Sequence, residues 1–175
     1  MRKTALCAAV ALSFCALSSI ANATQINFTG VVTAKSCELV SNGDLDFNLS
    51  TVGISDVQEA GQQNGGMSLA AAVQCAGATA GTVTMSLMPI PGSFSGKVLK
   101  NIATTDAAKG VGFVVMNEKN ELLDFSAGSA EITVPMSGSG TANVIIATNY
   151  AKDGSGDVVT AGNVNAVLPF VLTYE

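Results

Sequence analysis

The sequence contains no histidine and no tryptophan among its 175 residues. Without histidine, a Ser-His-Asp triad, a Cys-His nucleophile pair and a zinc site built on imidazole ligands are all excluded. Only 12% of the residues are charged, and the 13 acidic residues outnumber the 8 basic ones. A protein that neutralises nucleic-acid phosphates needs clustered Lys and Arg, so the composition argues against nucleic acid as a partner.

Carboxylate pairs are the remaining candidates for catalysis. The nearest pairs in the sequence are Asp44 with Asp46 and Glu118 with Glu121. Each pair lies in a turn-like segment where acidic side chains are usually solvated, so we predict that the protein is not an enzyme and has no catalytic residues. Residues 153–157 (DGSGD) faintly resemble a calcium loop but lack the further acidic ligands of an EF-hand. We therefore expect a solvated turn there, with no metal and no cofactor.

The chain begins with a pattern typical of a secretory signal peptide. Arg2 and Lys3 precede an apolar run over residues 5–17, and small residues with A-x-A spacing end at Ala23. We expect cleavage after Ala23. The run is shorter than the ~20 apolar residues of a membrane-spanning helix, and no comparable run follows, so no membrane span is expected. The alternative, lipid attachment at Cys15, matches its motif poorly.

Removal of residues 1–23 would leave residues 24–175, a length that suits a single domain. Residues 24–175 would then contain six basic and all 13 acidic residues, because Arg2 and Lys3 are removed with the leader. Of the four cysteines only Cys37 and Cys75 would remain. Two cysteines in an exported protein indicate one disulfide, with two unpaired thiols as the alternative.

Short runs rich in Val, Ile, Thr and Phe alternate with clusters of Gly, Asn, Asp and Ser along the whole chain. This alternation is typical of an all-β domain, and about eight short strands in this length favour a β-sandwich. One helical turn is predicted over residues 104–109, where Thr and Asp precede helix-forming residues. The predicted strands span residues 26–34, 45–49, 68–75, 82–88, 112–116, 132–134, 142–150 and 164–174.

Both ends of residues 24–175 alternate apolar and polar residues as strands do. The termini of domains usually fray into polar tails. An apolar free end needs a groove for its burial, which is worth about 1.5–3 kcal/mol for each large side chain. The residues concerned are Ile26, Phe28, Gly30 and Val32 near the beginning, and Phe170, Leu172 and Tyr174 at the end.

Four motifs, taken in order, resemble the pilins of the chaperone-usher pathway, the family that includes the subunits of type 1 and P pili. The first is FTGVV at residues 28–32, followed by Cys37, and the second is Cys75 at the place of the family's second cysteine. The third, GVGFVV at residues 110–115, is similar to the family's Gly-(Val/Leu)-Gly strand. The fourth, residues 160–174, resembles its closing strand with a penultimate tyrosine. Together the motifs span the whole of residues 24–175.

The resemblance implies an incomplete immunoglobulin-like β-sandwich that lacks its last strand, in a structural subunit of a bacterial surface fimbrium. Residues 24–33 would then be an N-terminal donor-strand extension that completes the sandwich of a neighbouring subunit by β-augmentation. Ile26, Phe28 and Val32 would enter pockets of the neighbour, and Gly30 would allow close backbone approach. The polymer would contain copies of this chain or other pilus subunits.

The same resemblance implies two assembly partners. A periplasmic chaperone would first pair with the closing strand, and an outer-membrane usher would then pass the subunit to the cell surface. The residues of this contact would be Phe170, Leu172, Tyr174 and the carboxylate of Glu175.

Two departures from the family pattern leave questions open. Only six residues, 24–29, precede Gly30, so both a shaft role and an adaptor role at the tip remain. Pro169 lies inside the predicted closing strand and has no N–H to donate, so we expect a local gap or bulge in the ladder there. A different class of function, a monomeric secreted β-sandwich that binds a ligand through its loops, is the alternative.

Overall fold

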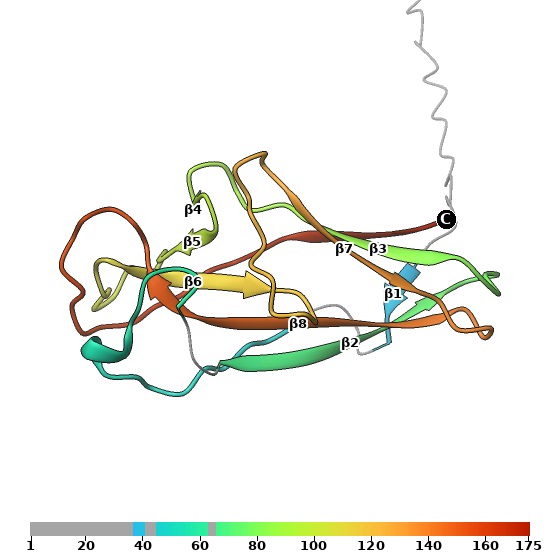
Figure 1. Ribbon diagram of the computed structural model, residues 1–175, viewed down its shortest axis with the longest axis horizontal. Coiled ribbons are helices and arrows are strands. Elements are labelled where there is room, and N and C mark those ends of the chain that lie inside the picture. Colours follow the sequence, from blue (N-terminus) through green and yellow to red (C-terminus); the bar gives the residue numbers. More distant parts are fainter. Residues whose placement is uncertain (1–36, 41–44, 63–65) are drawn as a thin grey trace, which may run out of the picture. The chain divides into compact units, whose positions relative to one another are not determined.

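A computed structural model describes residues 37–40, 45–62 and 66–175. This part of the chain is all-β, with a single turn of 3-10 helix at Ile54–Asp56 (Figure 1). None of its helices has the length and apolar character needed to cross a membrane. The strands are β1 (Cys37–Leu39), β2 (Met67–Cys75), β3 (Thr82–Leu87), β4 (Phe94–Ser95), β5 (Val98–Lys100), β6 (Val111–Met116), β7 (Ala130–Pro135), β8 (Thr141–Lys152) and β9 (Phe170–Tyr174).

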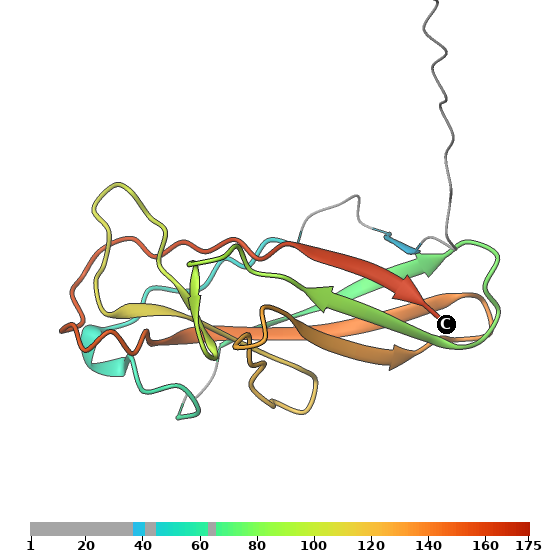
Figure 2. The same ribbon diagram turned by 90° about the horizontal axis from the view of Figure 1, so that it is seen from above.

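The strands form two antiparallel sheets that face each other in a sandwich (Figures 1 and 2). Six strands make one sheet in the order β1-β2-β8-β6-β5-β4, and three make the other in the order β7-β3-β9. The long strands β2 and β8 run side by side and pair over eight residues of each. β9 is an edge strand of the smaller sheet and pairs with β3.

The core lies between the inner faces of the two sheets, where strands such as β3 bury alternate residues and β6 is buried on both faces. Val73 on β2 and Val144 on β8 contribute from the larger sheet, and Val83 and Met85 on β3 from the smaller one. Phe125, in the connection between β6 and β7, is also fully buried. The all-β sandwich predicted from the alternation is therefore confirmed.

Five predicted strands, over residues 68–75, 82–88, 112–116, 132–134 and 142–150, correspond to β2, β3, β6, β7 and β8 with shifts of one or two residues at their ends. The short strands β1, β4 and β5 are not predicted by the sequence. The predicted strand at residues 26–34 lies outside the described residues. The remaining two predicted strands border the candidate site and are treated below.

The predicted helical turn over residues 104–109 is wrong. Asp106 has a φ of 47°, in the left-handed region, which an α-helical turn does not allow. The backbone carbonyls of this loop are bound by side chains instead. Asn101 Nδ2 donates to the Ala108 carbonyl at 2.8 Å, and Asn163 Nδ2 donates to the Thr105 carbonyl at 3.0 Å. These tertiary contacts outweigh the local helix preference.

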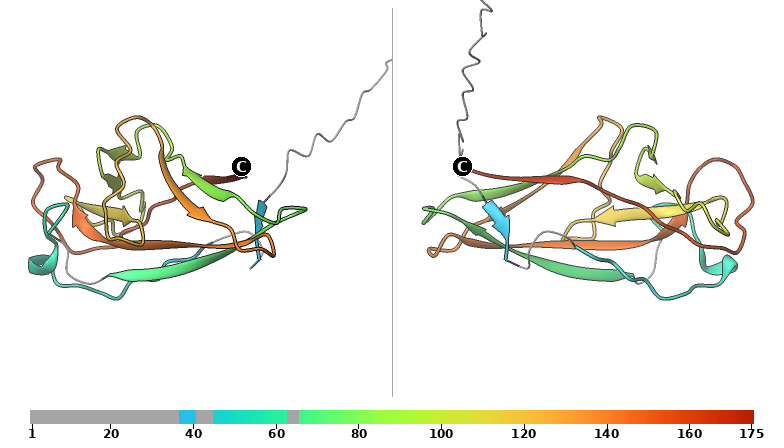
Figure 3. Two further views of the ribbon diagram at one scale, coloured as in Figure 1. Left: turned by 45° about the vertical axis from the view of Figure 1, so that its right-hand side comes forward. Right: turned by 180° about the vertical axis from the view of Figure 1, so that it is seen from behind.

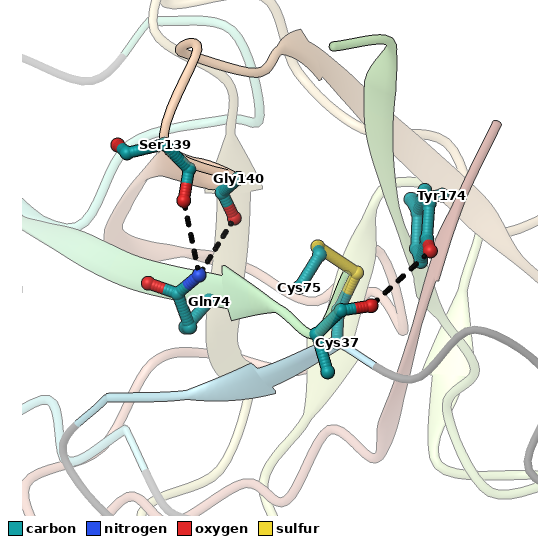
Figure 4. The surroundings of a disulfide bond; sticks show 7 residues. Cys37, Gln74, Cys75, Ser139, Gly140 and Tyr174 are labelled. Carbon is teal, nitrogen blue, oxygen red and sulfur yellow. Dashed lines mark hydrogen bonds between the residues drawn. A yellow bond between two sulfur atoms is a disulfide. The ribbon is translucent and has the colours of Figure 1, made fainter. Parts of the chain in front are cut away.

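The disulfide expected from the sequence joins Cys37 and Cys75, with Cα atoms 4.0 Å apart (Figure 4). It ties β1 to the end of β2, where the two residues are ladder partners. On the other side of β2, Gln74 Nε2 donates to the carbonyls of Ser139 and Gly140 in the turn before β8, each at 3.3 Å. This end of the sandwich is therefore held by one covalent bond and by side-chain hydrogen bonds.

Candidate functional site

A groove opens along one side of the sandwich, with a hollow of about 470 Å³. One wall is the segment 45–49 and the other is the segment 164–170, which leads into β9 (Figure 3). The floor comes from β5, β6 and β8 of the larger sheet. The floor residues are Leu99, Phe113, Val115, Ile146 and Thr148.

Each wall is extended, and half-buried side chains alternate along it with exposed ones. On one wall Leu45, Phe47 and Leu49 are half-buried, and the residues between them are exposed. On the other wall the half-buried residues are Val164, Ala166, Leu168 and Phe170, with exposed residues between them. In a closed sandwich, side chains that face inward in this way would be fully buried. Along the groove, the inward-facing apolar side chains of both walls are therefore still partly exposed to solvent.

The wall 45–49 corrects one prediction, because the structure has no strand there. The alternation of apolar and polar residues that predicted a strand shows only that one side of the segment is buried. The segment is indeed half-buried on one side. A ladder also needs a neighbouring backbone with free N–H and C=O groups. In the part of the chain that the structure describes, the groove lies beside this segment where a neighbouring strand would be. The segment therefore has the residue pattern of a strand without forming a ladder.

The other wall corrects a second prediction, because the closing strand begins at Phe170 rather than Val164. Pro169 lies just before β9, consistent with the gap expected from its missing N–H. Its carbonyl still accepts a hydrogen bond from Met88 N at 2.8 Å. The pairing with β3 therefore starts at the proline, and residues 164–168 continue as an extended wall beyond it.

A second hollow, of about 460 Å³, continues the groove away from β9. The two hollows share Val164 and Asn165. Between them on the floor lies an aromatic pair: Phe113 lines the first hollow, Tyr150 lines the second, and their ring centroids are 5.1 Å apart. The groove thus extends past the end of the first hollow, where more polar residues line it.

The predicted contact residues of the closing strand lie along this side of the sandwich. Phe170, Leu172 and Tyr174 are half-buried, and in the ladder they are opposite Leu87, Met85 and Val83 of β3. Phe170 also lines the first hollow. Glu175 is exposed at the end of the chain, where its backbone exchanges two hydrogen bonds with Thr82, at 2.9 and 3.1 Å. The predicted donor residues Ile26, Phe28, Gly30 and Val32 lie outside the described residues.

The floor and the wall 45–49 are parts of the site that sequence reasoning did not identify. Leu45 and Phe47 belong to a predicted strand, but nothing in the pattern assigns them to a groove. Phe113 belongs to a motif used for the family resemblance, and its place on the groove floor depends on the pairing of β6 with β8. The only usable signal is the alternation itself, which marks the side of each segment that turns inward.

Most of the side chains that line the groove are apolar. Thr148 is the polar residue on its floor, and its hydroxyl donates to the Val114 carbonyl at 2.9 Å, so it is satisfied without an occupant. Asp46 is the acidic residue along the groove, and it lies on the solvent side of its wall. No cluster of three or more metal-ligating side chains occurs in the described residues. The arrangement suits the burial of an extended apolar segment.

The carboxylates considered for catalysis or calcium binding lie in turns. Glu121 accepts a hydrogen bond from Asn117 Nδ2 at 2.7 Å, and Glu118 is exposed. Asp153 Oδ1 accepts from the backbone N and the hydroxyl of Ser155, at 2.9 and 2.6 Å, within residues 153–157. These contacts are those of capped surface turns. Asp44 lies outside the described residues.

Comparison with known proteins gives one matching family model and, among solved structures, a match to a pilus subunit. The family model described as "Fimbrial protein" matches residues 26–175. Among solved structures, the crystal structure of the P pilus rod subunit PapA aligns with a TM-score of 0.49 at 19% sequence identity, over 86% of this chain and 100% of that chain. The search of curated proteins finds no significant match.

Proposed function

This chain belongs to the fimbrial protein family and is a structural, non-enzymatic subunit of a pilus, and from that premise we propose that its groove receives a strand donated by another subunit. Its partners are other pilus subunits, and its place is the fimbrium at the cell surface. The proposed step is donor-strand exchange, in which each subunit completes the sandwich of its neighbour.

One observation carries this proposal: the inward-facing residues of both groove walls are only half-buried. An added strand between the walls would cover them on the side that is now open. Each large apolar side chain that it removes from water contributes about 1.5–3 kcal/mol at full burial. The outer edge of β9 and the wall that precedes it would gain ladder partners in the same step.

The proposed donor is the N-terminal segment 24–33 of a neighbouring copy or of another pilus subunit. Its apolar residues Ile26, Phe28 and Val32 recur at even spacing, as a strand requires to place them on one face. At about 3.3 Å per residue, ten residues span about 33 Å. The segment 164–174, with eleven residues, is of comparable length, so the donor suits the groove in length and pattern.

The proposal includes a path to the surface. Cleavage of the leader after Ala23 would release the chain into the periplasm. A chaperone would there cover β9 and the groove. At the usher, the donor strand of the next subunit would replace the chaperone. Shielding is needed because an uncovered apolar groove beside an edge strand is prone to aggregation. Phe170, Leu172, Tyr174 and Glu175 are the proposed chaperone contacts.

The first test is deletion of residues 24–32 from the full-length precursor. The deletion variant is expected to keep its groove and to co-purify with the chaperone of its pilus system, because the groove is built from residues 45–170. It is expected to be unable to donate a strand, so that fibres end where it is added. Fibre length by electron microscopy and SDS-resistant polymer by gel electrophoresis measure this. Normal fibres from the variant alone would show that this segment is not the donor.

A matched pair of substitutions tests the groove itself. Ala166→Phe places a ring in the first hollow, whereas Val158→Phe places the same ring on a residue that is 83% exposed and lines neither hollow. We expect Ala166→Phe to lower fibre yield at least tenfold and Val158→Phe to leave it within twofold. Equal yields from the two variants would contradict occupancy of the groove.

A further inference from the structure

We propose that Asn101 is a positioning residue for donor uptake, whose side-chain amide holds Asn163 and the start of the wall 164–170 in the orientation that a donor strand needs. The inference rests on the proposed function, since it concerns the same groove. Asn101 directly follows β5, outside the groove lining. It acts on the donor through the wall and does not touch it.

The Asn101 side chain uses both of its Nδ2 hydrogens and both lone pairs of its Oδ1. Asn101 Nδ2 donates to the carbonyls of Ala108 and Asn163, each at 2.8 Å. Asn101 Oδ1 accepts from the backbone N of Ala103 and of Asn165, each at 2.9 Å. A single side chain therefore joins the loop 101–108 to Asn163 and to Asn165 of the wall.

The contact matters to the wall because strand pairing holds little of it. A β-bridge pairs Asn163 with Ala107, but residues 164–169 belong to no strand or bridge. Asn165 lies between Val164 and Ala166, which both line the groove, and its N–H is bound by the Asn101 side chain. Its carbonyl accepts from Ile102 N at 2.8 Å. The next backbone tie toward β9 is the Met88 N to Pro169 carbonyl bond. The hydrogen bonds of Asn165 thus fix the orientation of the segment in which Val164 and Ala166 point into the groove.

The loop on the other side of Asn101 is itself packed backbone to backbone against the wall. Asn163 N donates to the Asp106 carbonyl at 2.7 Å, and Ala108 N donates to the Asn163 carbonyl at 3.0 Å. A Cβ atom added to Gly162 would lie 2.4 Å from the Asp106 carbonyl oxygen and 2.5 Å from Ala108 N. Close packing of this kind leaves little room for another arrangement, so the Asn101 amide orients the wall against a firm support.

A wall that is already in its binding orientation lowers the entropic cost of donor binding, because the wall does not lose conformational freedom when the donor binds. Without the amide, the Asn165 N–H loses its partner and can turn to water, and the Asn163 carbonyl keeps only its bond from Ala108 N. The donor would then order the wall as it binds. The consequence is a weaker complex with the donor, beyond the loss of stability of the free subunit.

The test uses the full-length mature chain and a fluorescent synthetic peptide of residues 24–36 as the probe. Asn101→Ala removes all four hydrogen bonds. Asn117→Ala is the matched control, because Asn117 also binds its own turn through its amide, donating to Glu121 at 2.7 Å and accepting from the N–H groups of Lys119 and Glu121 at 3.0 Å each. Asn117 is not a groove residue.

We expect Asn101→Ala to raise the peptide Kd about tenfold, as the loss of one or two net hydrogen bonds would. Asn117→Ala is expected to leave the Kd within twofold, even where both variants lower Tm by similar amounts. Hydrogen exchange followed by mass spectrometry is expected to be faster over residues 163–168 in Asn101→Ala alone. Equal Kd changes in the two variants, or unchanged exchange over the wall, would overturn the positioning role.

The two proposals fail in different ways. If the wild-type chain does not bind the peptide, donor-strand exchange through residues 24–36 is wrong. Amide hydrogen exchange over residues 163–168 of the Asn101→Ala variant, measured without peptide, then still tests whether the Asn101 amide holds the wall. If the wild type binds the peptide and Asn101→Ala binds it equally well, the groove proposal stands and the role of Asn101 is wrong.

Discussion

Cys37 lies directly opposite Cys75 in the β1–β2 ladder, so the disulfide and the ladder join the same two residues. β1 has only three residues, and the chain before Cys37 is the segment from which the proposed donor extends. In a fibre, tension on the donor segment would reach the subunit at Cys37. The covalent bond would carry that tension to β2, which pairs along its length with β8 in the middle of the larger sheet.

Loss of the disulfide is therefore expected to destabilise the subunit. The bond closes a loop with a sequence separation of 38 residues, for which the chain-entropy estimate is about 4 kcal/mol. We expect the double variant Cys37→Ala, Cys75→Ala to lower the free energy of unfolding in guanidinium by about this amount. Wild-type protein treated with a reductant serves as the comparison. A midpoint unchanged in both samples would contradict a stabilising role.

Gly112 on β6 predicts a second large effect. A Cβ atom added there would lie 2.1 Å from the Leu99 carbonyl oxygen and 3.0 Å from a methyl carbon of Val98, so β5 would have to move. We expect Gly112→Ala to destabilise the fold by at least about 2 kcal/mol, since overpacking against backbone is hard to relieve. Because Leu99 and Phe113 line the groove, donor binding is expected to weaken as well.

Gly138 is the matched control for Gly112. The nearest atom to a Cβ added there is the Thr79 carbonyl oxygen at 4.0 Å, and its φ is not positive. Gly138→Ala is expected to change the free energy of unfolding by less than about 1 kcal/mol, through the entropy of the unfolded chain. Thermal unfolding of the two variants side by side measures the difference. Similar values of Tm would show that the approach of β5 to β6 is not as restrictive as the distances indicate.

Much of the fold can be predicted from alternation, because a sandwich buries every second residue of a strand. The strands β2, β3, β7 and β8 follow from that rule, whereas β6 is buried on both faces and was predicted from its run of Val and Phe. The pairing between them does not, since the stacking of Phe113 on Tyr150 joins strands that are distant in sequence. β4 and β5 lie within FSGKVLK at residues 94–100, where Gly and Lys interrupt the alternation.

The candidate site was predicted in part and for a physical reason. An alternating pattern shows which side of a segment turns inward, and so it identifies Phe170, Leu172 and Tyr174. It does not show whether a neighbouring strand is present, and so it predicts strands at residues 45–49 and 164–169 where the structure has groove walls. Asn101 has no signal in the sequence, because its partners Asn163 and Asn165 are 62 and 64 residues away.

Asp124 provides a prediction about pH. Hydrogen bonds from the Ser126 hydroxyl and backbone N–H, at 2.6 and 2.9 Å, lower the pKa of the Asp124 carboxyl below its ordinary value. A carboxyl whose pKa is lower in the folded state than in the unfolded state stabilises the fold above the unfolded pKa. That contribution is lost as the pH falls through the unfolded pKa and then the folded one. It is a small contribution, because the carboxylate is exposed to solvent.

Ser126→Ala tests this prediction, because it removes the hydroxyl bond and keeps the backbone one. The pKa of Asp124, followed by the side-chain carboxyl signal in NMR titration, is expected to rise toward its ordinary value. The nearby Ser129→Ala variant is the control, since Ser129 makes no hydrogen bond to Asp124, and its titration is expected to match the wild type. If Ser126→Ala leaves the Asp124 titration unchanged, the hydroxyl is not the cause of the lowered pKa.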